Sequence, residues 1–288
     1  MPSVRTRTAT VMALRDQLRR PLVPILLVVV PAFIVIWSVA ITQATPRRLE
    51  LPGGVWVTTT MKALHGPEMA KFSVAIVAAL VGVFLMQSAL QGDRRLVVAG
   101  FRARETLQGD RRLVVAGFRA RETVIARLSA LAAAIFVVAA VAVLASAIGF
   151  EPASWLPVIA ALLLIGLIYG SVGALAGALL DKPAATYLIL FLVLVDLSVM
   201  QTPMFHATPA RFAELLPGYG PTRVMLEGFY AHSFSAGYEL SLAIGWAVAL
   251  VAAVYFVLRR ALGTEAPHRE PDTGVRYPHG VSSTGSSR

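Results

Sequence analysis

The chain has 288 residues, of which 57% are hydrophobic and 15% are charged. A soluble domain has about 45–50% apolar and about 25% charged residues, so this composition favours a membrane domain. The net charge of +10 would suggest nucleic-acid binding on a soluble protein, but basic residues also line the cytoplasmic ends of membrane spans. We therefore expect this chain to lie in a lipid bilayer and not to bind nucleic acid. Because the chain has no cysteine, disulfides, thiol chemistry and iron–sulfur clusters are excluded.

The first 20 residues are polar and basic, and Val11, Leu14 and Leu18 fall on one face of a helix. This pattern predicts an amphipathic helix that lies on the membrane surface before the first span. A disordered basic tail is the alternative.

Six apolar segments follow, each of about 20 residues or more, which as an α-helix crosses roughly 30 Å of hydrocarbon. They lie near residues 21–42, 72–91, 125–149, 155–180, 184–203 and 238–258. Residues 263–288 are rich in Pro, Gly, Ser and charge, and we expect them to form a disordered cytoplasmic tail. The sequence thus predicts an all-α integral membrane protein with one transmembrane domain over residues 21–262.

The basic residues predict the orientation of the spans. With the N-terminus inside, the inner regions hold 20 of the 26 Lys and Arg residues and the outer regions hold six. The outer six are Arg47, Arg48, Lys62, Lys71, Arg211 and Arg223. Because Lys and Arg resist translocation, this distribution favours both chain ends in the cytoplasm.

Residues 90–106 and 107–123 are two identical copies of LQGDRRLVVAGFRARET. The pair is too short and too exact for a fold repeat, and a recent, an engineered and an erroneous duplication all remain open. Each copy has a Gly-Asp pair that can begin a helix and an apolar patch framed by arginines, so each predicts a short interfacial helix. Such a helix could dock a cytoplasmic partner, or its arginines could serve only to keep the loop inside.

The long outer segment 204–237 mixes apolar residues with Pro/Gly breaks at Pro217-Gly218 and Gly220-Pro221. This mixture predicts two short helices that dip back toward the membrane, with an ordinary surface loop as the alternative.

Two features inside the spans are candidate functional or packing elements. Asp196 is a carboxylate within the fifth span, and two interpretations are open. It is either a proton- or ion-coupling group or, as we favour, a residue near the outer end that is hydrogen-bonded to a neighbouring helix. The fourth span carries small residues at helical spacing, which favour close packing inside the bundle over subunit dimerisation. These are Gly166, Gly170, Gly173 and Gly177.

Signals for catalysis are scarce. The chain has no P-loop motif and no H-E-x-x-H motif, and its five histidines are scattered. We therefore predict that the chain is not an enzyme and that it binds no metal or cofactor of its own.

The order of these features resembles the permease subunits of ABC-2-type (type V fold) ATP-binding-cassette exporters. The resemblance covers about residues 1–262, and its most specific part is GDRRLVVAGFRARETVIARL, which ends at Leu128. It implies six spans, a cytoplasmic coupling helix between spans two and three, and re-entrant outer helices before span six. It also implies a multi-pass protein of the cytoplasmic membrane that works as a dimer of permeases with separate ATPase subunits, which bind ATP and Mg²⁺.

The resemblance assigns ATPase docking to the duplicated segment. The second copy is favoured because it adjoins Val124–Leu128 in the family-like order, and the first copy is the alternative. The candidates in the second copy are Asp110, Arg111, Arg112, Phe118, Arg119, Arg121 and Glu122. Their counterparts in the first copy are Asp93, Arg94, Arg95, Phe101, Arg102, Arg104 and Glu105.

The implied function is export of a drug-like, lipid-like or glycan substrate, and nothing in the sequence selects among these cargoes. A secondary transporter or channel and a membrane scaffold without transport are the competing classes.

Overall fold

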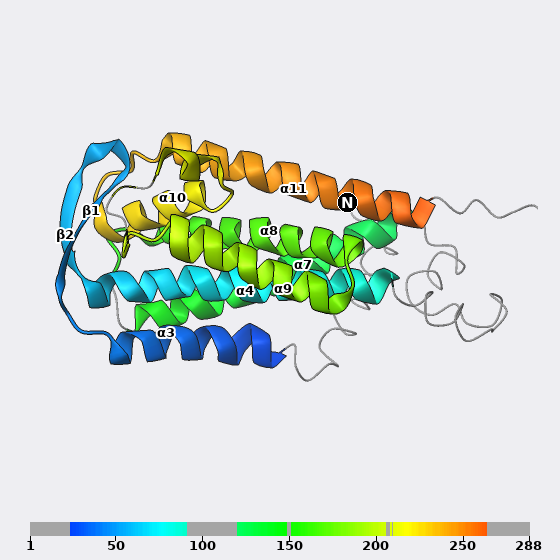
Figure 1. Cartoon of the computed structure of the whole chain (residues 1–288), viewed down its shortest axis with the longest axis horizontal. Helices are drawn as coiled ribbons and strands as arrows, with labels where there is room; N and C mark the ends of the chain where they lie inside the picture. The colour runs from blue at the N-terminus through cyan, green and yellow to red at the C-terminus, as the bar shows by residue number, and fades with distance from the viewer. Residues whose placement is uncertain (1–23, 91–119, 149–150, 206–207, 209, 264–288) are drawn as a thin grey trace, which may run out of the picture.

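The computed structural model describes residues 24–90, 120–148, 151–205, 208 and 210–263. This part of the chain forms an elongated bundle of helices with a two-stranded β-hairpin at one end (Figure 1). The predicted surface helix over residues 1–20, nearly all of the duplicated segment and the predicted tail lie outside the described residues.

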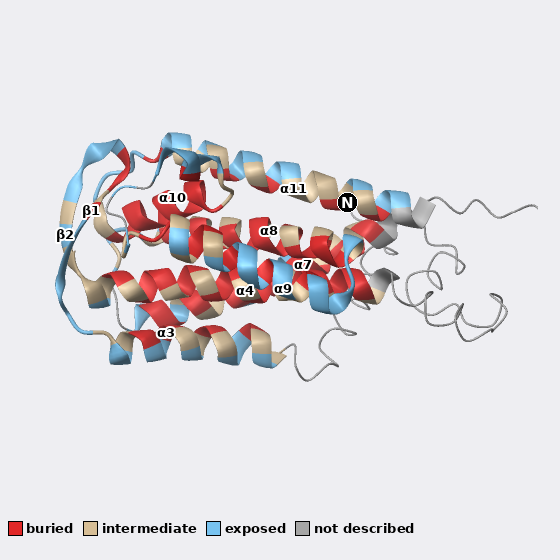
Figure 2. Cartoon of the chain, in the orientation of Figure 1, coloured by how far each residue is buried: buried red, intermediate tan, exposed pale blue. Residues whose placement is uncertain are grey.

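Five helices of the described chain are long and apolar enough to cross a membrane. They are α4 (Met61–Leu90), α7 (Ala120–Ala147), α8 (Trp155–Leu179), α9 (Lys182–Val193) with its π-helical continuation η3 (Leu194–Met200), and α11 (Gly237–Gly263). Their outward faces expose large apolar side chains such as Phe136, Phe191 and Phe256 (Figure 2). Since lipid is the solvent that suits such faces, the chain is a multi-pass membrane protein with a mainly helical fold.

The first predicted span, over 21–42, is a shorter helix in the structure. It consists of a π-helical turn, η1 (Ile25–Val29), followed by α3 (Val30–Ile41). The ring of Pro31 would clash with the carbonyl of Leu27 in a regular α-helix, and the wider π turn relieves this clash. The 17 residues of Ile25–Ile41 rise about 25 Å, near the lower limit for a membrane span.

The predicted outer loop over 43–71 is instead a β-hairpin followed by the start of α4, which is a small departure from an all-α fold. Strand β1 (Pro46–Glu50) pairs antiparallel with β2 (Trp56–Thr60) through the turn η2 (Pro52–Gly54). Gly53 and Gly54 have φ angles of 78° and 76°, a region that glycine enters without strain.

Helix α4 begins at Met61, whereas the sequence predicted a span that begins near 72. The polar residues Lys62, His65, Glu68 and Lys71 suggested a loop, but they belong to the first turns of this helix. Lys71, which we counted among the outer basic residues, is only 1% exposed. The prediction failed because side chains that bury their charges against one another give the same sequence pattern as a solvated loop.

The helix ends gather at two opposite ends of the bundle (Figure 1). We call the end that carries β1 and β2 the hairpin end. There the N-terminus of α8 meets α10 (Tyr219–Tyr230), where Ser154 N–H donates to the Gly228 carbonyl. At the opposite end, the Arg127 guanidinium of α7 donates to Ser88 Oγ of α4 (3.0 Å). Lys182 of α9 lies over the ring of Phe84, 4.8 Å from its centroid.

Helices α4 and α8 form the centre of the bundle, and the glycines of α8 lie in their contacts. A Cβ atom on Gly173 would overlap the Ala79 carbonyl of α4, and one on Gly177 would approach Val83 within 2.9 Å. Gly166 and Gly170 lie instead against Ile135 of α7. All four glycines therefore make packing contacts inside this chain, where a larger side chain would separate the helix backbones.

Candidate functional site

Asp196 is the most distinctive buried side chain at the hairpin end. It lies in η3, is 6% exposed, and accepts hydrogen bonds from three groups. Tyr169 Oη donates at 2.5 Å, the Gly218 N–H at 3.0 Å and Gln201 Nε2 at 3.3 Å. Three donors suit an ionised carboxylate, which is an acceptor at both oxygens.

These contacts join parts of the chain that are distant in sequence. Tyr169 lies in α8, Asp196 lies in the π-helical η3, and Gly218 is the residue that directly precedes α10. Gln201 Nε2 also donates to the Ala213 carbonyl in η4 (Arg211–Leu215), at 2.8 Å. Asp196 therefore fixes the place where α10 enters the bundle. A π turn carries one extra residue, and such turns often occur at functional sites.

A second charged pair lies beside this carboxylate. Glu68 and Lys71, one turn apart on α4, form an ion pair of 2.8 Å with exposures of 2% and 1%. The charge of Lys71 also acts on Asp196, and the side chain of Thr202 lies beside Glu68. We call Glu68, Lys71 and Asp196 the charged triad. Glu68 and Lys71 were not predicted from the sequence because residues 43–71 resemble a loop, although the i, i+3 spacing of the pair next to an apolar run was a usable signal.

Pro67, next to Glu68 of the charged triad, interrupts the backbone hydrogen bonds of α4. Because proline has no N–H, the carbonyl of Ala63 loses its helical partner. The Tyr230 hydroxyl of α10 donates to this carbonyl at 3.0 Å. Burial raises the pKa of the Tyr230 hydroxyl, which keeps it protonated as this hydrogen bond requires.

Helix α10 is enclosed by the bundle, with every residue from Tyr219 to Phe229 buried. Its two charged side chains, Arg223 and Glu227, form hydrogen bonds to neighbouring segments of the chain. Arg223 donates to the Glu50 carbonyl of β1 at 2.5 Å. Glu227 accepts from the N–H and Oγ of Ser235 and from the Ala236 N–H, at 2.5, 2.5 and 2.7 Å. The two short helices predicted in 204–237 thus correspond to the single turn of η4 and to α10.

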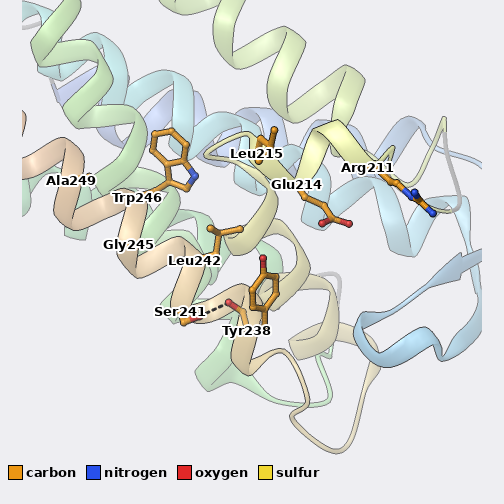
Figure 3. A pocket seen from close by; sticks show the side chains of 9 residues that line it. All are labelled: Arg211, Glu214, Leu215, Tyr238, Ser241, Leu242, Gly245, Trp246 and Ala249. Carbon is orange, nitrogen blue, oxygen red and sulfur yellow. Dashed lines mark hydrogen bonds between the residues drawn. The ribbon is translucent and has the colours of Figure 1, made fainter.

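A pocket of about 680 Å³ lies between η4 and the first half of α11 (Figure 3). Its wall combines the charged residues Arg211 and Glu214 with Tyr238 and Trp246. Gly245 faces open space, since a Cβ atom there would meet nothing within 4 Å. The pocket lining shares no residue with the charged triad, and its two charged residues both come from η4.

The predicted docking residues lie almost wholly outside the described part of the chain. Helix α7 begins at Ala120, so the backbone of Arg121 and Glu122 belongs to it. Within the described residues, no group of His, Asp or Glu side chains could hold a metal ion.

Comparison with protein-family models, with curated protein sequences and with solved structures gave no significant match to this chain. Its function is therefore inferred from its own residues.

Proposed function

We propose that this chain is the membrane subunit of an ATP-binding-cassette exporter and that a separate chain supplies the ATPase. The sequence GDRRLVVAGFRARETVIARL resembles the coupling segment of ABC-2-type permeases and lies between α4 and α7. The absence of a P-loop motif in the chain fits an ATPase on a partner chain.

One structural observation carries this proposal. Helix α4 ends and α7 begins at the same end of the bundle, where Arg127 donates to Ser88. The two described residues that flank the arginine-rich segment 91–119, Leu90 of α4 and Ala120 of α7, therefore lie at the same end of the bundle, opposite the hairpin. A segment attached in this way can transmit a movement of a cytoplasmic ATPase to the central helix α4 and to α7 at the same time.

The two ends of the bundle also differ in charge, which predicts how the bundle is oriented in the membrane. The opposite end carries Arg127, Lys182 and the last arginines of α11, which favours the cytoplasmic side. The hairpin end carries α10, a short helix enclosed by α8 and α11, which we assign to the outer leaflet.

The test is co-purification of the tagged full chain from the membranes of its native host. We expect a P-loop ATPase subunit in the preparation and ATP hydrolysis that follows that subunit. The chain purified without it should show only background hydrolysis. If the chain elutes alone and still hydrolyses ATP, or if no ATPase associates with it under any mild extraction, the proposal is wrong.

Paired variants test the coupling segment itself. Arg119 and Arg121 are replaced by glutamine in one variant, and Arg102 and Arg104 in the other. We expect the first variant to weaken association with the ATPase strongly, because the second copy adjoins Val124–Leu128 in the family-like order. The second variant should change association little, because 17 residues turn a helix by about 260° beyond four full turns and the two copies cannot face the ATPase together from one straight helix. A third variant that lacks residues 90–106 should retain the ATPase. If arginine removal from this single-copy chain also leaves association unchanged, the arginines are topology signals only.

A proton-driven transporter is the second candidate, and the buried charged triad is the observation that favours it. Transport by proteoliposomes of the purified chain alone, driven by a proton gradient without ATP, would support this candidate and exclude the first.

A further inference from the structure

The buried ionisable side chains at the hairpin end do not balance in formal charge. Among the described residues there, the buried acids are Glu68, Asp196 and Glu227, and the buried bases are Lys71 and Arg223. Three carboxylates against two cations leave one uncompensated negative charge. A charge without a partner inside a membrane protein is costly, so one of the three acids should bind a proton.

The hydrogen-bond donors around each acid indicate which one is neutral. Asp196 accepts from Tyr169, Gln201 and Gly218, and Glu227 accepts three bonds from Ser235 and Ala236. Such donor sets match ionised carboxylates. If the carboxyl were protonated, its own O–H group would point at another hydrogen-bond donor. These two acids are therefore the charged ones.

Glu68 has a different environment. Its Oε2 pairs with Lys71 and the side chain of Thr202 lies beside the carboxyl, but its Oε1 has no hydrogen bond of good geometry within the described chain although it is fully buried. The titratable groups around it are Lys71 and the half-exposed His65 on its own helix, the Tyr230 phenol of α10, and Asp196 of η3 beyond Lys71. Lys71 is the only cation of the triad, so Glu68 and Asp196 compete for it.

We propose that the Glu68 carboxyl is a proton-binding site, which leaves Lys71 as the counter-charge of the ionised Asp196. A metal cation is a poor alternative, because the Lys71 ammonium already occupies the cation position and too few oxygen ligands surround it. When Glu68 releases its proton, a second carboxylate shares the positive charge of Lys71, which Glu68 already contacts. The charge of Lys71 then compensates Asp196 less, and Asp196 holds Gly218 at the start of α10. The proton thus controls the charge at the joint between η3 and α10. This inference does not depend on ATP-driven export.

The first test compares infrared spectra of the purified full chain with those of the Glu68→Gln variant, at neutral pH in a detergent without carbonyl groups. We expect the wild-type spectrum to contain the absorption of one protonated carboxyl group. The Glu68→Gln spectrum should lack this absorption. The matched control is Glu227→Gln, which makes the same chemical change at an equally buried site and should lose no such absorption. If the wild-type spectrum has no protonated carboxyl that depends on Glu68, the proposal is wrong.

The second test uses the thermal unfolding midpoint of the same proteins. Glutamine has the shape and charge of a protonated glutamic acid, so Glu68→Gln should unfold at nearly the wild-type midpoint. Glu227→Gln should unfold at a clearly lower temperature, because its three donors lose an ionised acceptor. A Glu68→Gln variant that fails to fold, or that loses as much as Glu227→Gln, would overturn the assignment of the proton to Glu68.

Discussion

At the residue scale, the interior of the hairpin end depends on polar side chains whose partners come from other helices. The carboxylate of Asp196 alone connects α8, η3 and the start of α10. A hydrogen bond to a charged group contributes about 1.5–3 kcal/mol, more than a bond between neutral groups. The stability of this region should therefore respond strongly to small chemical changes.

Replacing Tyr169 by phenylalanine removes only the hydroxyl that donates to Asp196. We expect the free energy of unfolding to fall by about 1.5–3 kcal/mol, because the carboxylate loses its shortest hydrogen bond. Tyr187→Phe is the matched control, since Tyr187 is 74% exposed on α9 and should change stability little. Chemical unfolding of the three proteins in one detergent measures this difference, and equal losses in both variants would contradict the role given to Asp196.

Glycine positions in α8 and α11 predict opposite effects of the same substitution. Gly173→Ala should cost about 1–3 kcal/mol, because the new methyl group would overlap the Ala79 carbonyl of α4. Gly245→Ala should be neutral or stabilising by up to about 1 kcal/mol, because the methyl group enters open space and alanine favours the helix. Unfolding midpoints measure both, and a stabilised Gly173→Ala would show that α4 and α8 are not in close contact.

The sequence predicted Asp196 and the α8 glycines as notable residues, but it did not predict the charged triad. A carboxylate inside an apolar run is visible in the sequence because the contrast is local. Glu68 and Lys71 lie among other polar residues, so their i, i+3 spacing is a weak signal, and the packing of α8 and α10 against α4 is what distinguishes them from a loop.

At the element scale, the sequence predicted the long apolar helices better than the outer connections. The helices over 155–179 and 182–200 lie near their predicted ranges, because membrane thickness sets their length. The hairpin and the early start of α4 were missed, since their conformation depends on tertiary contacts. Leu49 and Leu51 of the hairpin, for example, are buried with Leu64 and Leu226.

Besides these leucines, one hydrogen bond from α10 should stabilise the hairpin. Arg223→Met removes the donor to the Glu50 carbonyl while it keeps an unbranched apolar stem in the core. We expect faster amide hydrogen exchange over residues 46–60 and unchanged exchange in the middle of α4. Arg211→Met is the control, since Arg211 lies exposed in η4. Equal exchange in wild type and Arg223→Met would show that the buried leucines alone hold the hairpin.

At the scale of the whole molecule, the two ends of the bundle predict its orientation in the membrane. The hairpin end should face outward, because Arg127, Lys182 and the last arginines of α11 lie at the other end. The chain has no cysteine, so single cysteines can report each end without a background signal. Val55 is 57% exposed in the hairpin, and Asp181 is exposed at the opposite end between α8 and α9.

We expect a membrane-impermeant maleimide to label Val55→Cys in intact cells and to label Asp181→Cys only after the membrane is opened. The bilayer separates the two positions, and 20 of the 26 basic residues are assigned to the side of Asp181. Both variants should label equally in solubilised protein, which controls for thiol reactivity. Labelling of Asp181→Cys alone in intact cells would invert the orientation, and would place the arginine-rich linker where no cytoplasmic ATPase could reach it.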